Sequence, residues 1–238
     1  MSDFRFTRPS NFPPIVKNLV IINVLVFLAQ LVFENQYQLT SILALHPVDL
    51  PEFKPYQIFT HMFTHSPTFI FHIIFNMLVL WMFGRVLENV WGPKRFLFFY
   101  LACGVGAALL HLLVQHLRFD PEIIRQLNYA YMTGDEQAMQ ELVGKAGFLA
   151  SAVGASGAIM GIMAAFAYLF PNTPLILFPI PIPIKAKWLV LAYIAFDLLG
   201  GFGQVRGDSI AHFAHLGGAI TGFIIVLYWN KNNRKTLY

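Results

Sequence analysis

The sequence has little charge for its length. Only 12% of its 238 residues are Asp, Glu, Lys or Arg, whereas 57% are hydrophobic. A water-soluble domain usually carries about 25% charged residues. This deficit excludes an ordinary soluble surface. We therefore expect the lipid bilayer as a partner and no nucleic acid.

Cysteine is almost absent as well. Cys103 is the one cysteine and lies in an apolar run, which excludes an intrachain disulfide and a metal-thiolate cluster. The pairs His61/His65 and His212/His215 have ligand-like spacing. However, there is no H-E-x-x-H motif, and Asp208 is the one acidic residue near the predicted membrane histidines. We expect neither a metal nor a cofactor.

Long apolar runs are what the chain does have. Several approach the roughly 20 residues with which a helix crosses a bilayer. They are continuous rather than alternating, which favours helices over a β-barrel. The expected fold is all-α, a single polytopic membrane domain over residues 1–238 that forms a six-helix bundle. The predicted spans are residues 15–33, 69–90, 95–117, 148–170, 187–201 and 210–229.

The basic residues predict the orientation of this bundle. With six spans, eleven Lys and Arg residues fall on the side that holds both termini and five on the other side. Cytoplasmic loops carry the excess of positive charge, so we expect both termini in the cytoplasm. The N-terminal stretch is too polar and proline-rich for a cleaved signal peptide and too short for a transit peptide. A bacterial cytoplasmic membrane is the expected location.

Three connecting segments have compositions of their own. Residues 34–68 mix polar and apolar side chains, which is typical of a segment in the membrane interface. Residues 118–146 are acidic and helix-forming, so we expect water-exposed helices there. The segment "FPIPIPIK" predicts a proline-rich stop between the fourth and fifth spans.

Four polar side chains inside the predicted spans need an explanation, because such groups are costly in lipid. His72 and Asn76 lie on one face of the second span, Ser156 in the fourth and His215 in the sixth. Counting ~1.5 Å per residue places all four in the outer third of the membrane, with Ser156 and His215 ~10 Å below its surface. This shared depth predicts that they meet in one site.

Glycine spacing indicates how Ser156 and His215 could come together. Gly157 and Gly161 form G-x-x-x-G in the fourth span, and Gly218 and Gly222 do so in the sixth. Such pairs let membrane helices pack backbone to backbone. A serine between glycines is common in packing seams, but this interpretation is compatible with a nucleophile within about 3 Å of its base.

The remaining polar residues and motifs do not predict a catalytic role. The G-x-S-x-G elbow of α/β-hydrolases fails, because Ala158 stands where its second glycine belongs. Asp197 falls in the outer half of the fifth span, where we expect a hydrogen bond to a neighbouring helix or a position near the headgroups. The remaining histidines are predicted to be interfacial or solvated. They are His46, His61, His65, His111 and His116.

The motifs "HIIFN" (72–76), "GASGAIMG" (154–161) and "AHLGGAITG" (214–222) together resemble those of rhomboid intramembrane serine proteases, from about residue 56 to 228. The resemblance implies a serine–histidine dyad without an aspartate. Ser156 would be the nucleophile and His215 the general base, since His212 fits the motif less well. His72 and Asn76 would help to form the oxyanion hole with the backbone N–H of Ser156.

The same resemblance implies substrates that are transmembrane proteins with a helix-destabilised segment near the outer face. The fifth span and the loop "GGFGQVRGD" are the expected lateral gate, because glycines weaken the helix end. Tyr56 and Gln57 replace the Trp-Arg pair that the family often has in the first outer loop, so the anchoring of that loop is left open.

Two other functions remain open at this point. One is a non-proteolytic rhomboid-like protein that binds or escorts membrane proteins, although such relatives usually lack the nucleophile or the base. The other is a small transporter using the outer polar pocket, which is disfavoured because nothing polar continues toward the inner face. The natural substrate, the cleavage site and the oligomeric state are not determined by the sequence.

Overall fold

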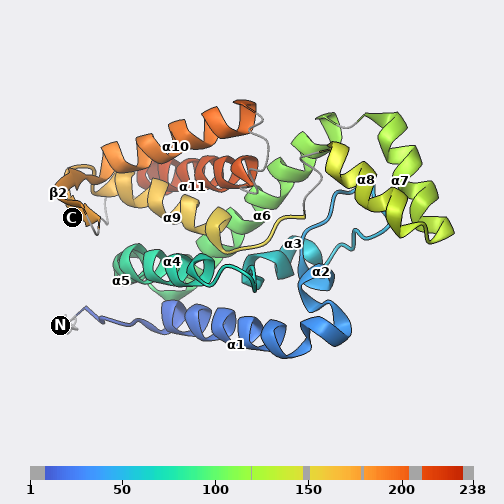
Figure 1. The fold of residues 1–238 in the computed structure, drawn as a ribbon. Helices are drawn as coiled ribbons and strands as arrows, with labels where there is room; N and C mark the ends of the chain where they lie inside the picture. The colour runs from blue at the N-terminus through green and yellow to red at the C-terminus, as the bar shows by residue number, and fades with distance from the viewer. Residues whose placement is uncertain (1–8, 119, 147–150, 178–179, 204–210, 233–238) are drawn as a thin grey trace, which may run out of the picture.

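A computed structural model describes residues 9–118, 120–146, 151–177, 180–203 and 211–232. The chain is mostly helical, and one two-stranded ribbon interrupts the helices (Figure 1). In chain order the elements are α1 Pro14–Tyr37, α2 Leu39–Leu43, α3 Gln57–Thr60, η1 His61–Phe63, α4 Phe71–Val79, η2 Leu80–Gly84, α5 Arg85–Trp91, α6 Pro93–Arg118, α7 Pro121–Thr133, α8 Glu136–Ala146, α9 Ser156–Leu169, β1 Pro174–Leu177, β2 Ile180–Lys185, α10 Ala186–Gly203 and α11 His212–Asn232.

The long helices run side by side as a bundle (Figure 1). Within the described residues, four are long and apolar enough to cross a bilayer: α1, the continuous α4–η2–α5 rod, α6 and α11. The shorter helices α9 and α10 lie against them. Helix α1 begins and α11 ends on the same side of the bundle, here called the terminal face. The prediction of an all-helical polytopic bundle is confirmed.

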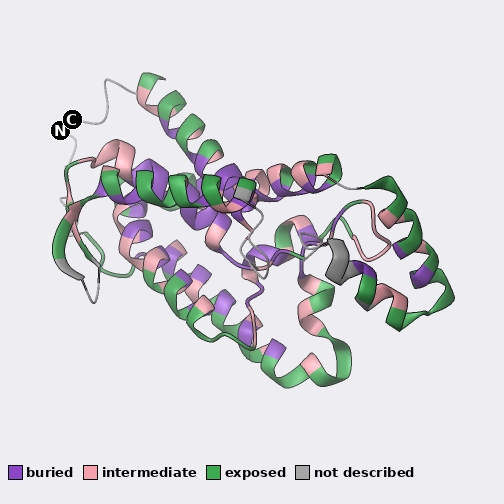
Figure 2. Ribbon diagram, turned by 45° about the horizontal axis from the view of Figure 1, so that its top comes forward, coloured by how far each residue is buried: buried purple, intermediate pink, exposed green. Residues whose placement is uncertain are grey.

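Helix α9 forms the centre of the core. Ten consecutive residues, from Gly157 to Phe166, are buried against α6, α11 and the α4–η2–α5 rod. Figure 2 shows the buried residues in the middle of the bundle and exposed residues along its outward sides. Many of those exposed residues are large and apolar, such as Leu25 and Phe75. An apolar outer surface of this extent suits lipid rather than water.

The start of α9 differs from the predicted span. We expected a helix over residues 148–170 with Ser156 inside it, but helix α9 begins at Ser156. Residues 151–155 are not helical, because Ala152 pairs with Leu45 in a β-bridge and Gly154 has φ 123°, a conformation that L side chains rarely adopt. Residues 147–150 lie outside the described part. The serine therefore stands at a helix N-terminus.

The first long loop is anchored by a glutamine. Gln57 is 1% exposed, and its amide group bonds four times to loop backbone. Oε1 accepts from the N–H groups of His46 (3.3 Å) and Lys54 (3.1 Å), while Nε2 donates to the carbonyls of Ile42 (3.3 Å) and Glu52 (3.0 Å). One buried amide thus ties together the loop whose anchoring the sequence left open.

The other two connecting segments, residues 118–146 and the proline-rich residues 178–185, differ in how well they match the predictions. Residues 118–146 contain helices α7 and α8, and the helical prediction is confirmed. The proline-rich segment is not a simple stop, because β1 and β2 pair antiparallel, with Pro174 opposite Lys185. Isoleucines favour strand geometry, and a two-stranded ribbon has only edges, where proline is tolerated.

Candidate active site

Ser156 and His215 are brought together at the ends of two helices. Ser156 is the first residue of α9, and His215 lies in the first turn of α11. The Ser156 hydroxyl is 2.8 Å from His215 Nε2, and the two groups share a hydrogen bond. Fifty-nine residues separate them in the chain, so helix packing alone creates this contact.

The close packing of α9 on α11 depends on glycine. A Cβ on Gly218 would collide with the carbonyl oxygen of Gly157, and one on Gly222 would lie 2.6 Å from the carbonyl of Gly161. Gly161 in turn faces Cys103 of α6, which a Cβ would also meet. The four glycines proposed from the sequence therefore lie at the interface, where backbone meets backbone.

Asp197 of α10 is the residue that the sequence did not assign to the site. Its carboxylate is 1% exposed, and Oδ1 accepts a hydrogen bond from His215 Nδ1 at 3.0 Å. The expected hydrogen bond to a neighbouring helix is present, but its partner is the histidine that contacts Ser156. A buried charge within a predicted span was the available signal, since such charges usually have a functional partner.

The same carboxylate oxygen accepts a second hydrogen bond. His212 Nδ1 is 2.8 Å from Asp197 Oδ1, and the His212 ring packs edge-on against Phe196. A Cβ on Gly200 would collide with the His212 ring, so this glycine lets the imidazole approach α10. His212 thus helps to hold Asp197, while His215 faces the serine.

His72 lies beside the serine, as the sequence predicted, and Asn76 lies one turn deeper. A Cβ on Gly154 would come within 2.8 Å of His72 Nε2 and 3.6 Å of Ser156 Oγ, so all three groups surround one small volume. Asn76 Nδ2 donates to the carbonyl of His72 at 2.9 Å. One amide hydrogen of Asn76 is therefore engaged with its own helix.

Three other histidines were placed wrongly by sequence reasoning. His61, His65 and His111 are buried rather than interfacial or solvated, because the first long loop folds back over the bundle. The His65 ring packs edge-on against His72. Burial, with a smaller contribution from His72, lowers the pKa of His65 to about 3. Burial also lowers the pKa of His61, so both loop imidazoles are neutral near pH 7.

The described residues contain no group of three His, Cys, Asp or Glu side chains placed to hold a metal ion. The arrangement instead aligns a hydroxyl, an imidazole and a carboxylate. Such an alignment can transfer a proton from the hydroxyl and leave it nucleophilic.

A family comparison agrees with these motifs. The rhomboid domain model matches residues 52–232. The chain belongs to the rhomboid family. Its relatives include "Rhomboid protein 1, mitochondrial" of Saccharomyces cerevisiae, 30% identical over 69% of this chain and 39% of the relative. "RHOMBOID-like protein 12, mitochondrial" of Arabidopsis thaliana is 31% identical over 88% and 56%. "Rhomboid protease AarA" of Providencia stuartii is 30% identical over 65% and 49%.

These relatives limit what is established for this rhomboid. The chain spans about half or less of the length of each one, so their whole-protein activities carry over only as proposals. The relatives from yeast and Arabidopsis are mitochondrial, so the expected bacterial cytoplasmic membrane is not supported. A multi-pass membrane location stands on the apolar helices.

The end of α10 away from the terminal face is held in this rhomboid by contacts at Gly201. Arg118, at the end of α6, donates from Nη1 to the carbonyl of Gly201 at 2.8 Å. Its guanidinium also lies over the ring of Phe213, 4.6 Å from the centroid. A Cβ on Gly201 would lie 3.0 Å from that same ring. The rest of the expected gate, residues 204–208, lies outside the described part.

We expect Arg118→Ala to destabilise the protein by about 1–3 kcal/mol, because a charged hydrogen bond and a ring contact are both lost. Thermal unfolding in detergent measures this change. Arg125→Ala is the matched control, since Arg125 pairs with Glu122 on the exposed surface of α7 and should have little effect. Equal shifts for the two variants would show that Arg118 does not fasten α10.

Proposed function

We propose that this rhomboid is an intramembrane serine endopeptidase that cleaves transmembrane proteins near the membrane face opposite the terminal face. One observation carries the proposal. The hydroxyl of Ser156, the imidazole of His215 and the carboxylate of Asp197 form a continuous hydrogen-bonded chain of 2.8 and 3.0 Å. The proposal extends the serine–histidine dyad of the family resemblance by a third, positioning residue.

The roles follow from the direction of the hydrogen bonds. Asp197 accepts from Nδ1 of His215, so the neutral ring carries its proton there and offers the lone pair of Nε2 to Ser156. His215 takes the hydroxyl proton as Ser156 attacks the substrate carbonyl, and later gives it to the leaving amine. The buried carboxylate stabilises the imidazolium formed in between.

The N-terminus of α9 supplies donors for the oxyanion. The first N–H groups of a helix have no partner within the helix, and they carry a partial positive charge. Ser156 is the first residue of α9, so its own N–H belongs to this set. The His72 ring and the Ser156 hydroxyl border the same space beside Gly154, so the ring is placed to donate a further hydrogen bond. Asn76 acts through His72, whose carbonyl it holds.

The depth of the site fits hydrolysis inside a membrane. A substrate helix must unwind to present its backbone to Ser156, which favours segments with glycine, proline or small residues. Helix α9 has 14 residues and is ~21 Å long, shorter than the ~30 Å hydrocarbon core. Its serine-bearing end therefore stops below the opposite face, where water can reach it. The excess of positive charge on the terminal face supports both termini in the cytoplasm or an equivalent compartment.

The test is cleavage of a labelled transmembrane substrate by the purified protein in detergent or liposomes. Wild type should cleave it, whereas Ser156→Ala and His215→Ala should lose turnover and still bind the substrate. His46→Ala, which changes a histidine in the loop before α3, is the control and should keep activity. If wild type bound the substrate without cleaving it, and Ser156→Ala bound it equally well, the escort function would be favoured instead.

A further inference from the structure

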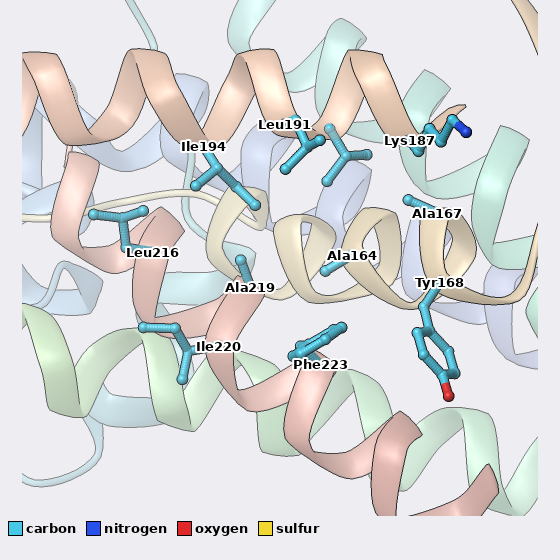
Figure 3. Close-up of a pocket in the computed structure, with 11 residues that line it drawn as sticks. Ala164, Ala167, Tyr168, Lys187, Leu191, Ile194, Leu216, Ala219, Ile220 and Phe223 are labelled. Carbon is cyan, nitrogen blue, oxygen red and sulfur yellow. The ribbon is translucent and has the colours of Figure 1, made fainter. Parts of the chain in front are cut away.

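One pocket in the bundle has no part in the proposed chemistry, because neither Ser156, His215 nor Asp197 lines it. It measures about 320 Å³ and lies between α9, α10 and α11. Figure 3 shows Lys187 and Tyr168 at one end of it and Leu216 at the other. Apart from these two polar residues its lining is aliphatic or aromatic.

The hollow follows from small side chains at the crossing of three helices. Ala164 and Ala167 of α9 and Ala219 of α11 leave space that larger residues would fill. The rim is made of apolar side chains that are about half exposed, including Leu191 and Ile220. Because these helices lie in the membrane, the pocket opens toward lipid tails and not toward water.

The polar end of the pocket lies at the terminal face. Lys187 is in the first turn of α10, and its ammonium lies 5.5 Å from the ring centroid of Trp188. The Tyr168 hydroxyl accepts a hydrogen bond of 2.9 Å from Asn230, near the end of α11. A cation and a phenol hydroxyl thus stand where the headgroups of that leaflet would be.

Charge on this face is strongly one-sided. Among the described residues, Glu88 is the only acidic side chain at the terminal face, and it is 2% exposed. Both of its oxygens are engaged, since they accept from the N–H groups of Ile15 (2.9 Å) and Val16 (2.8 Å) at the start of α1. Within the part of the chain that the structure describes, the basic residues of this face therefore have no exposed acidic partner. They are Lys17, Arg85, Lys94, Arg95, Lys185, Lys187 and Lys231.

We propose that this pocket binds one anionic phospholipid, with an acyl chain between α9, α10 and α11 and the headgroup phosphate on Lys187. Basic sites between membrane helices select anionic headgroups in this way. A neutral phospholipid would fill the apolar part but would leave the excess positive charge uncompensated.

The bound lipid also supports α10. The outer half of this helix is held to α11 by Asp197 and to α6 by Arg118, whereas its first turns border the pocket. Asp197 is ten residues beyond Lys187, ~15 Å along the helix. A lipid that fills the pocket therefore packs the first turns of α10 against α9 and α11, from Lys187 at the terminal face to Ile194, one turn before Asp197.

The experiment measures retained lipid rather than cleavage, so it is independent of the proposed protease activity. The full chain is reconstituted in nanodiscs of equimolar phosphatidylcholine and phosphatidylglycerol, released into mild detergent and analysed by native mass spectrometry. Wild type should retain one phosphatidylglycerol in preference to phosphatidylcholine. Lys187→Gln should lower this retention about fivefold, the effect of one basic residue near the phosphate.

Two further variants complete the test. Lys17→Gln removes the same charge from the same face, on α1 and away from the pocket, and should retain lipid as wild type does. Ala167→Phe fills the pocket and should reduce both lipids. Equal retention of the two lipids by wild type, or equal phosphatidylglycerol retention by Lys187→Gln and Lys17→Gln, would overturn the proposal.

Discussion

Replacing Asp197 with asparagine should lower the turnover number about 10³-fold while substrate binding and folding stay close to wild type. The asparagine fits the same space, but its amide group no longer provides a carboxylate for the imidazolium of His215, and it can turn a donor toward Nδ1. The ring would then present the wrong tautomer to Ser156. Loss of the aspartate in a serine triad has effects of up to about 10⁴ for this reason.

The matched control for this prediction is Asp49→Asn. Asp49 also binds a histidine, His116, at 2.9 Å, but this pair lies at the surface of the first loop. We expect its turnover to remain within about twofold of wild type, since exposed pairs contribute little. The measurement is kcat and KM on the same transmembrane substrate. If Asp197→Asn lost no more turnover than Asp49→Asn, Asp197 would be a structural residue only.

Gly218→Ala should lower the rate of cleavage about 10²-fold or more, because the added methyl group collides with the carbonyl of Gly157 and forces α11 away from α9. Neither partner of the collision is a flexible side chain, so the helices themselves must separate. Even a shift of 1 Å breaks the hydrogen bond between Ser156 and His215, and misplacement of this size can cost about 10² in rate. Overpacking also destabilises a core by about 1–3 kcal/mol.

The control variant is Ile224→Phe on the same helix. Ile224 is 59% exposed and faces away from α9, so a larger apolar side chain there should be accommodated by lipid. Cleavage and thermal unfolding are measured for both variants. Unchanged cleavage by Gly218→Ala would mean that the two helices do not need this close approach, and the packing argument would fail.

Much of the site could be predicted because membrane helices impose strong constraints. Depth along a helix follows from residue count, so the sequence alone predicts that Ser156 and His215 lie at the same depth. The glycine spacing predicted how α9 and α11 pack. Asp197 could not be assigned to the site from the sequence, because its depth does not indicate which side of α10 it occupies. That side depends on how α10 packs on α11.

The loops were harder, since local sequence does not determine their burial. His61 and His65 belong to a segment of mixed polarity that could lie in the interface, yet they are buried beneath the folded loop. Gln57 holds that loop by hydrogen bonds to backbone carbonyls, and backbone groups are the same in every residue, so the sequence does not indicate which ones it will contact. The start of α9 was misplaced for a related reason, because the pairing of Ala152 with Leu45 overrides the apolar run.

The most direct test of the central claim is covalent labelling by a fluorophosphonate, followed by peptide mass spectrometry. This reagent traps a serine whose proton is taken by a neighbouring base. If Ser156 exchanges its proton with His215, the adduct should form on Ser156 in wild type and be lost in His215→Ala. An adduct on another residue, or equal labelling of Ser156 without the histidine, would contradict the proposed pairing.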